Sequence, residues 1–377
     1  MALRLFDTAR QAIVPFQPGE IVTMYVCGIT PYDATHLGHA ATYVTFDLVH
    51  RRLEDLGHTV RLVRNVTDVD DDILRAARAR DVHYLDLSNA QVRRFQRDME
   101  ALGVRPPWSE PRVTSAIPDI RGIIAMVLDR GHAYVSGGGV YFDVSSFPGF
   151  GALSKRDRET MLRLGEARGE RPDDPNKRDP LDFVLWQPSA PGEPAWESPW
   201  GPGRPGWHVE CSALVLRELG VTIDLHGGGT DLVYPHHECE RAQSEAATGE
   251  PLARHWLHQA LVHIDGEKMS KSRGNLVFVA DLTEHVDARA VRLALMAHHY
   301  RTPWEWRDEL LDVATKRLAA WSGSLGGKPG EGVLDDVRAA LDDDLDAPGA
   351  LAVIDRAAAA GHDVRAAAEL LGVKLAA

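Results

Sequence analysis

The chain of 377 residues has few cysteines, few lysines and no long apolar run, and each shortage excludes a class of protein. Cys27, Cys211 and Cys239 are too few and too scattered to form the disulfide framework of a small secreted domain. No apolar stretch is long enough to span a bilayer, and residues 1–25 lack a basic segment followed by an apolar run. We therefore expect a cytoplasmic protein without membrane contact, whose cysteines serve chemistry or bind a metal.

Positive charge is scarce as well. The formal net charge is −13, and only 7 of the 42 basic residues are lysine. Proteins that neutralise many phosphates usually present a basic face, so this balance argues weakly against a large nucleic-acid partner. Two of the few lysines, Lys268 and Lys271, fall in one short segment, KMSKS.

Apolar periodicity predicts a parallel α/β sheet. Residues 21–28 are a β-branched apolar run that ends in glycine, residues 37–57 have helical spacing, and residues 59–66 indicate a second strand. A strand, a helix and a second strand in this order make a βαβ unit. Ligands of such sheets bind at the carboxyl ends of the strands, so CGIT (27–30) and NVTD (65–68) should line one crevice.

The remaining pattern divides the chain into regions. We expect a domain built on this parallel sheet over residues 1–262, interrupted at about 85–180 by an α+β insertion of helices and short strands. Residues 263–310 are expected to form a glycine-flanked loop and helices, and residues 311–377 a helical bundle.

Two short motifs indicate chemistry on phosphates. In HLGH, His36 and His39 lie three residues apart at the start of the expected helix, where free amide groups favour anions. In KMSKS (268–272), two lysines on a glycine-flanked loop suit a departing pyrophosphate, whose charge develops in the transition state. Taken alone, a histidine pair at this spacing is more often solvated or structural, and a solvated basic loop is the alternative for the lysines.

Cysteine and histidine also recur at three places that the predicted sheet brings to one crevice. Cys27 ends the first strand, and Cys211 lies in GWHVECS (206–212). The segment YPHHECE (234–240) adds His236, His237, Cys239 and Glu240. Zinc binds Cys and His readily, but none of these is a C-x₂-C pair, so a lone buried cysteine at each place is the alternative.

HLGH and KMSKS, in this order, resemble the signature pair of class I aminoacyl-tRNA synthetases. The likeness covers nearly the whole chain and is closest to cysteinyl-tRNA synthetases, in NVTDVDD (65–71), KRDPLDFVLW (177–186), GPGRPGWHVECS (201–212) and HGGGTDLVYPHHE (226–238). It implies a class I synthetase-type Rossmann (HUP-like) parallel sheet with an inserted connective subdomain and a C-terminal helical region, in which residues 263–310 carry the KMSKS loop and a stem-contact-like region. It also implies an enzyme that makes an aminoacyl-adenylate and pyrophosphate from ATP, with Mg²⁺ accompanying the nucleotide.

The same resemblance implies one zinc ion at the base of the amino-acid pocket, where it binds the substrate thiolate. Carried onto this chain, the ligands are Cys27, Cys211, His236 and Glu240. Whether Glu240 completes the set stays open, and Cys239 is a competing neighbour. A thiolate is a much better zinc ligand than a hydroxyl, and sites built on one strong partner reject analogues lacking it by roughly 10⁴.

The resemblance also implies which residues act on the adenylate. His36, His39, Lys268 and Lys271 would be catalytic. The residues that would hold the adenylate come from strand ends and the turns after them: Cys27, Gly28, Ile29, Thr30, Thr42, Asn65, Val66, Thr67, Trp207, Gly229, Thr230, Asp231 and Val262. Trp207 would form an aromatic wall and Asp231 would hold the substrate ammonium; a core tryptophan and a capping aspartate are the alternatives.

The segment CGITPYDATHLGHAATY (27–43) resembles the mycothiol-pathway ligases rather than the tRNA enzymes. These ligases form a carbon–nitrogen bond: they activate L-cysteine with ATP and transfer it to the amine of 1D-myo-inositol 2-amino-2-deoxy-α-D-glucopyranoside, releasing AMP. The chain ends soon after residues 340–357, so we expect no anticodon-binding domain and no tRNA partner. A monomer is expected as well, although the sequence does not fix the oligomeric state.

Two other functions stay open. One is a truncated cysteinyl-tRNA synthetase, or a relative that loads cysteine onto tRNA or another amine. The other is a relative that only binds nucleotide or a protein partner, against which the intact motifs speak. Residues 167–172, ARGERP, match the ligases' motif only loosely, so the sugar contacts and the base that deprotonates the amine are not assigned.

Replacing Lys271 by alanine should lower the rate of adenylate formation with little change in the affinity for cysteine. The reason is that its charge would stabilise pyrophosphate only in the transition state. Cysteine-dependent exchange of label between pyrophosphate and ATP measures both quantities. A large rise in the KM for cysteine at unchanged kcat would contradict this role.

Overall fold

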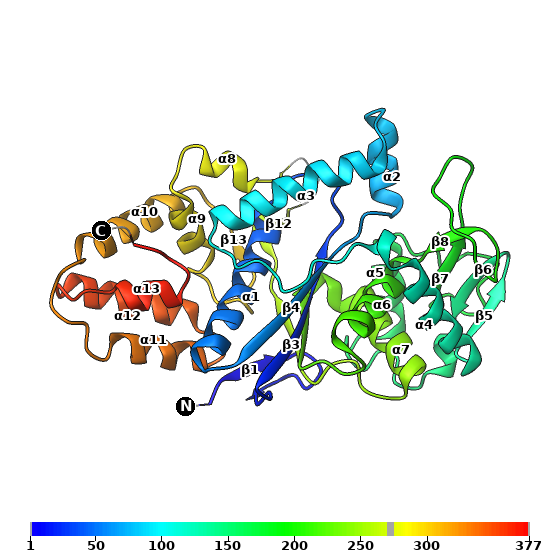
Figure 1. Ribbon diagram of the computed structural model, residues 1–377, viewed down its shortest axis with the longest axis horizontal. Coiled ribbons are helices and arrows are strands. Elements are labelled where there is room, and N and C mark those ends of the chain that lie inside the picture. Colours follow the sequence, from blue (N-terminus) through cyan, green and yellow to red (C-terminus); the bar gives the residue numbers. More distant parts are fainter. Residues whose placement is uncertain (1, 270–274, 376–377) are drawn as a thin grey trace.

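The expected parallel sheet is confirmed and lies at the centre of the molecule (Figure 1). The computed structural model describes residues 2–269 and 275–375. Four parallel strands run in the order β10-β9-β3-β4. Their bounds are β3 (Ile21–Ile29), β4 (Thr59–Val66), β9 (Leu225–Gly229) and β10 (Trp256–Gln259). Most of their side chains are buried, as the near-continuous apolar runs require of a parallel sheet covered on both faces.

Helix α1 (Leu37–Asp55) joins β3 to β4 and brings their carboxyl ends side by side. The amide of Thr67 donates to the carbonyl of Ile29 at 3.0 Å, so the strand ends CGIT and NVTD lie side by side, although, among these described residues, 27–30 line the cavity there and 65–68 do not. Gly28 is required there, because a Cβ atom at this position would lie 1.6 Å from the carbonyl oxygen of Asn65. The absence of a side chain lets the two strand ends approach closely.

The inserted region begins with helices and continues as an antiparallel sheet of order β5-β6-β7-β8, at the right of Figure 1. The last strand of this sheet ends at residue 205, beyond the expected end of the insertion near 180. The reason is that β7 pairs with β6, and β8 pairs with β7. The bounds are α2 (Asp71–Ala79), α3 (Tyr84–Ala101), α4 (Ile117–Asp129), β5 (Ala133–Ser136), β6 (Gly139–Phe142), α5 (Arg158–Glu166), β7 (Phe183–Pro188) and β8 (Gly203–Pro205). Helices α6 (Trp207–Leu219) and α7 (Glu238–Thr248) then resume the α/β alternation.

The segments near the two ends of the chain pack against the central sheet and α1. An N-terminal hairpin, β1 (Arg4–Asp7) and β2 (Ala12–Pro15), lies beside β10. A small sheet of order β12-β11-β13 lies near the centre of Figure 1, and the last helices of the chain lie at the left. The bounds are β11 (Val262–Ile264), β12 (Glu267–Lys268), α8 (Val279–Thr283), α9 (Ala288–Leu295), β13 (Trp304–Glu305), α10 (Glu309–Gly323), α11 (Val333–Asp342), α12 (Ala347–Ala359) and α13 (Arg365–Leu370).

One apolar core runs from the central sheet through α1 into the C-terminal helices. A second core fills the space between the sheet, α4, α6, α7 and the antiparallel strands. Among the helices that the structure describes, none is both long and apolar enough to cross a membrane.

Arg292 on α9 ties the C-terminal helices to α1. Its side chain is completely buried and donates to the Asp47 carboxylate at 2.5 Å and to the carbonyls of Leu102 and Leu371. Burial disfavours charge on Asp47, but Arg292 and Arg51 hold the pKa of this carboxyl below its usual value. The guanidinium thus satisfies three groups that water cannot reach.

Arg292→Met should lower the free energy of unfolding by about 3–5 kcal/mol, because it leaves a buried carboxylate without this partner. Arg289→Met on the same helix is the matched control, since Arg289 is partly exposed and pairs with Asp287 at the surface. Urea unfolding measures both. Equal losses in the two variants would show that the buried ion pair does not anchor the C-terminal helices.

Candidate active site

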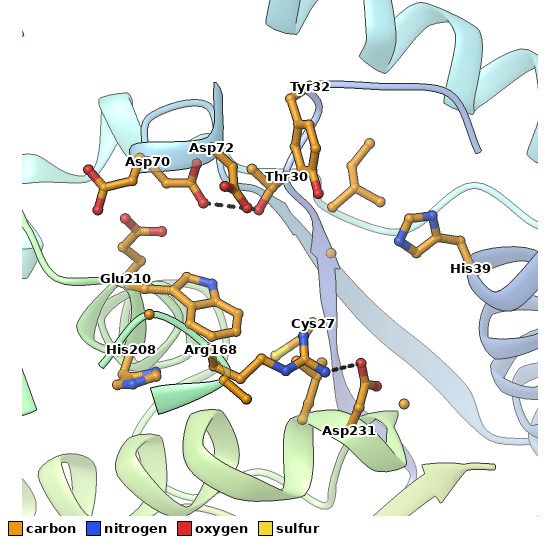
Figure 2. Close-up of a pocket in the computed structure, with 18 of the residues that line it drawn as sticks. Cys27, Thr30, Tyr32, His39, Asp70, Asp72, Arg168, His208, Glu210 and Asp231 are labelled. Atoms are coloured by element: carbon orange, nitrogen blue, oxygen red, sulfur yellow. Dashed lines mark hydrogen bonds and ion pairs between the residues drawn. The ribbon is translucent and has the colours of Figure 1, made fainter. Parts of the chain in front are cut away.

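A cavity of about 1130 Å³ opens at the carboxyl ends of the central strands, and Figure 2 shows part of its lining. Its walls come from the end of β3, the start of α1, the start of α2, the inserted region and α6. This is the position at which parallel α/β sheets bind ligands. Sites for drug-sized ligands commonly occupy about 300–1000 Å³, so the cavity has room for more than one small substrate.

The expected metal ligands converge at the base of this cavity. The ligand atoms of Cys27, Cys211, His236 and Glu240 all lie within 4.8 Å of one another, and all four residues are buried. The two sulfur atoms are 3.9 Å apart, and Nε2 of His236 lies 2.9 Å from Oε1 of Glu240. Two thiolates on a tetrahedral zinc ion, each at about 2.3 Å, would be separated by roughly 3.8 Å. The donor set therefore fits zinc in both chemistry and spacing.

A second group of four shares two of these residues. Cys27 and Glu240 also lie within 4.8 Å of His226 and His237. The first group has two thiols and the second has one, so the first is the softer set and the better match to zinc. Within the described part of the chain, Cys239 belongs to neither group.

Charges in this cluster are strongly coupled. Burial opposes ionisation of Cys211, but a hydrogen bond with Cys27 and the charge of His236 lower the pKa of Cys211 to about 6. Burial also disfavours charge on His236, yet Glu240 and Cys211 raise its pKa to about 10. Burial raises the pKa of Cys27 well above its ordinary value. A divalent cation that bound here would displace the protons of His236 and Cys27.

His236 is held in place by its neighbours. Its Nδ1 lies 2.9 Å from Nδ1 of His208, whose Nε2 lies 3.2 Å from Oε1 of Glu170. Trp207 stacks on the His236 ring with centroids 4.3 Å apart. Hydrogen bonds to the second nitrogen of a ligating histidine orient the ring, and this chain of contacts provides one. Trp207 also lines the cavity, and its role as an aromatic wall stays a prediction.

The HLGH histidines lie at the opening of α1 and line the same cavity. The His36 ring caps the helix: its Nδ1 accepts from the amide of Gly38 at 3.1 Å. The ring of His39 stacks on His36 with centroids 3.8 Å apart. Both imidazoles therefore lie at the positive end of a long helix, which favours phosphate.

The other expected adenylate-binding residues fall into two sets. Those that line the cavity are Cys27, Gly28, Ile29, Thr30, Thr42, Trp207, Gly229, Asp231 and Val262. In the cavity as the described residues form it, Asn65, Val66, Thr67 and Thr230 are not part of the lining. Asn65 supports the lining residue Gly28 from outside the cavity. Its Oδ1 accepts from the backbone amide of Gly28 at 2.7 Å, and its Nδ2 donates to the hydroxyl of Thr67.

The side chains of the KMSKS lysines are outside what the structure describes. Lys271 lies outside the described residues, and only the backbone of Lys268, in β12, is described. Met269 between them is buried and lines the cavity.

Several lining residues were not among the sequence-predicted site residues. Oδ2 of Asp231 pairs with Arg168 at 2.5 Å, which brings the loop after α5 across the cavity (Figure 2). Asp70 and Glu210 line it too, and both stand within motifs already quoted, NVTDVDD and GWHVECS. Burial raises the pKa of Glu210 well above its usual range, and the charges of Cys211 and Asp70 add to the effect. The place of Asp70 and Glu210 in those motifs is the feature from which the sequence could have indicated them.

Comparisons with known proteins agree with this geometry. The family model for the catalytic domain of class I tRNA synthetases (C) matches residues 13–316. The L-cysteine:1D-myo-inositol 2-amino-2-deoxy-alpha-D-glucopyranoside ligase of Thermobispora bispora is 51% identical, over 96% of this chain and 91% of its own. The ligase of the same name from Kribbella flavida is 50% identical, over 99% and 96%.

Solved structures show the fold alone. Mycobacterium tuberculosis methionyl-tRNA synthetase in complex with methionyl-adenylate has a TM-score of 0.65 at 17% identity, covering 93% of this chain and 89% of its own. Thermus thermophilus arginyl-tRNA synthetase has a TM-score of 0.57 at 13% identity, covering 96% and 83%.

Cys211→Ser should weaken zinc binding at least ~10²-fold, because a serine hydroxyl replaces a thiolate ligand. Cys239→Ser is the matched control, since Cys239 is equally buried but belongs to neither group of donors. Zinc titration of the metal-stripped proteins, followed by elemental analysis, compares the two. Loss of zinc from the Cys239 variant alone would reassign the ligand.

Proposed function

Because the chain belongs to the family of class I tRNA synthetase (C) catalytic domains, and to the L-cysteine:1D-myo-inositol 2-amino-2-deoxy-alpha-D-glucopyranoside ligases within it, we propose that it catalyses the ligation those relatives are named for. In this reaction of mycothiol biosynthesis, L-cysteine is activated with ATP and joined through an amide bond to the amine of the aminosugar-inositol. The observation that carries the proposal is identity of about half the residues over nearly the full length of both chains.

Selection of cysteine is assigned to the base of the cavity. Cys27, Cys211, His236 and Glu240 would hold zinc, which when bound supplies a strong partner for the substrate thiolate. Trp207, fixed by its stacking on His236, walls the space for a small side chain. Serine has a hydroxyl in place of the thiolate and would bind the zinc ion poorly. A difference of one atom can therefore decide which amino acid is selected.

Activation is assigned to the start of α1. The helix amides and the rings of His36 and His39 bind the phosphates of ATP and stabilise the charge that grows on them. The carboxylate of cysteine attacks the α-phosphorus, a new oxygen–phosphorus bond forms, and pyrophosphate leaves. Lys268 and Lys271 are proposed to meet the departing pyrophosphate, with Mg²⁺ accompanying the nucleotide.

Transfer completes the reaction in the same cavity. The acceptor amine, once neutral, attacks the carbonyl carbon of the cysteinyl-adenylate. The carbon–nitrogen bond forms, the carbon–oxygen bond to phosphate breaks, and AMP leaves with the bonding electrons. The volume of about 1130 Å³ supports a ternary arrangement of adenylate and acceptor. Action as a cytoplasmic monomer, without tRNA, is part of the proposal.

The test is incubation with cysteine, ATP and either the aminosugar-inositol or tRNA. We expect cysteine-dependent exchange of pyrophosphate into ATP without any acceptor, a cysteinylated aminosugar by mass spectrometry, and no charged tRNA. Cys211→Ser should raise the KM for cysteine far more than that for ATP, because only the thiolate partner is changed. Charging of tRNA alone would overturn the proposed acceptor, and absence of exchange would show a protein that only binds nucleotide.

A further inference from the structure

One wall of the cavity is rich in carboxyl groups that are not among the residues expected to hold the adenylate. Asp70, Asp71 and Asp72 come from the start of α2, and Glu210 comes from α6. Figure 2 shows Asp70, Asp72 and Glu210 gathered on the side of the cavity away from His39 and Asp231. A wall of this kind attracts a cation, and the acceptor of the proposed reaction carries one.

Glu210 provides the strongest sign of a missing partner. Its side chain is 1% exposed, and its Oε2 has no hydrogen-bond partner in the described part of the chain. Trp207 and Glu210 are three residues apart on α6, so both face the cavity. Burying a carboxyl oxygen without a hydrogen-bond partner is costly, and such an atom in a cavity wall indicates a partner that arrives with a ligand.

Asp70 is the residue of this wall that contacts a strand end expected to hold the adenylate. Its Oδ1 accepts from the amide of Ile73 and so caps α2 at 2.9 Å. Its Oδ2 accepts from the hydroxyl of Thr30 at 3.5 Å, and Thr30 belongs to the strand end that should hold the adenylate (Figure 2). Burial and the nearby charges of Asp72 and Asp71 raise the pKa of Asp70 to about 6. A carboxylate of this kind accepts a proton more readily than an ordinary aspartate.

The other charged groups on the wall are already paired. Arg204 forms ion pairs with Asp71 and with Glu193, and Glu193 also pairs with Arg78 at 2.5 Å. Asp72 pairs with Arg75 at the mouth. Within the described part of the chain, Asp70 and Glu210 are the two acidic residues of this wall that form no ion pair with a basic side chain.

We propose that Asp70 and Glu210 bind the ammonium group of the acceptor, and that Asp70 removes its proton before attack on the adenylate. The inference rests on the proposed function and names the base that it needs. One proton passes from the ammonium nitrogen to an oxygen of Asp70. The free electron pair then forms the carbon–nitrogen bond while AMP leaves. The second proton of the nitrogen passes to the AMP phosphate or to water as the amide forms.

The test separates the two half-reactions in Asp70→Asn and Glu210→Gln. Asparagine is also a good helix cap, so the first variant removes the base and keeps α2. We expect both variants to keep cysteine-dependent pyrophosphate exchange. Asp70→Asn should lower the rate of acceptor-dependent AMP release ~10²-fold or more. Glu210→Gln should raise the KM for the acceptor ~10-fold.

A chemical rescue distinguishes lost basicity from lost structure. Hydroxylamine is largely unprotonated at neutral pH, so it needs no base to attack the adenylate. Asp70→Asn should therefore form cysteine hydroxamate at the wild-type rate while ligation of the aminosugar stays slow. Asp346→Asn, at the aspartate that caps α12, is the matched control and should leave both reactions unchanged.

Three outcomes would overturn the inference: unchanged ligation in Asp70→Asn, loss of exchange and ligation to the same extent, or slow capture of hydroxylamine. They are separate from failure of the proposed function. If the unmodified protein shows exchange but makes no cysteinylated aminosugar, the proposed acceptor fails first. If it makes that product and the variants do so equally well, only the assignment of Asp70 and Glu210 fails.

Discussion

The structure depends on the close approach of four buried donor groups at the base of one cavity. Cys27 ends a central strand, Cys211 lies on α6, and His236 and Glu240 lie at and just inside the start of α7. Burial opposes charge on all four groups, and although His236 attracts Glu240 and Cys211, ionisation of Cys27 is left without compensation. A divalent cation supplies that compensation. The packing of α6 and α7 against the end of β3 is therefore also what would decide the substrate.

Around this base the cavity is divided by charge. The start of α1, with His36 and His39, favours phosphate because it is the positive end of the helix dipole. The start of α2 presents carboxylates, which favour a cation. A nucleotide and an amine would thus be drawn to different walls of one space. Between them lies the strand end at Thr30, whose hydroxyl contacts Asp70. The adenylate and its nucleophile would meet there.

The apolar spacing within single segments was enough to predict the central strands β3 and β4 and helix α1, but not the extent of the inserted region. The strand over residues 59–66 agrees with β4, and the helix expected from residue 37 agrees with α1. Both follow from apolar spacing over one continuous segment. The antiparallel sheet extends past the expected boundary because β7 pairs with β6, which lies about forty residues earlier in the chain. Such pairing depends on partners that spacing does not reveal.

For the site, the sequence by itself determined the residue types, their order and the motifs, and through them the family. Cys27, the HLGH histidines and the YPHHECE segment all stand out from residue type and position alone. Only the tertiary structure decided that two groups of four donors share Cys27 and Glu240, that Arg168 reaches Asp231, and that Glu210 is buried without a partner for Oε2. The physical reason is that motifs are local, whereas coordination, ion pairing and desolvation depend on distances between segments that only folding brings together.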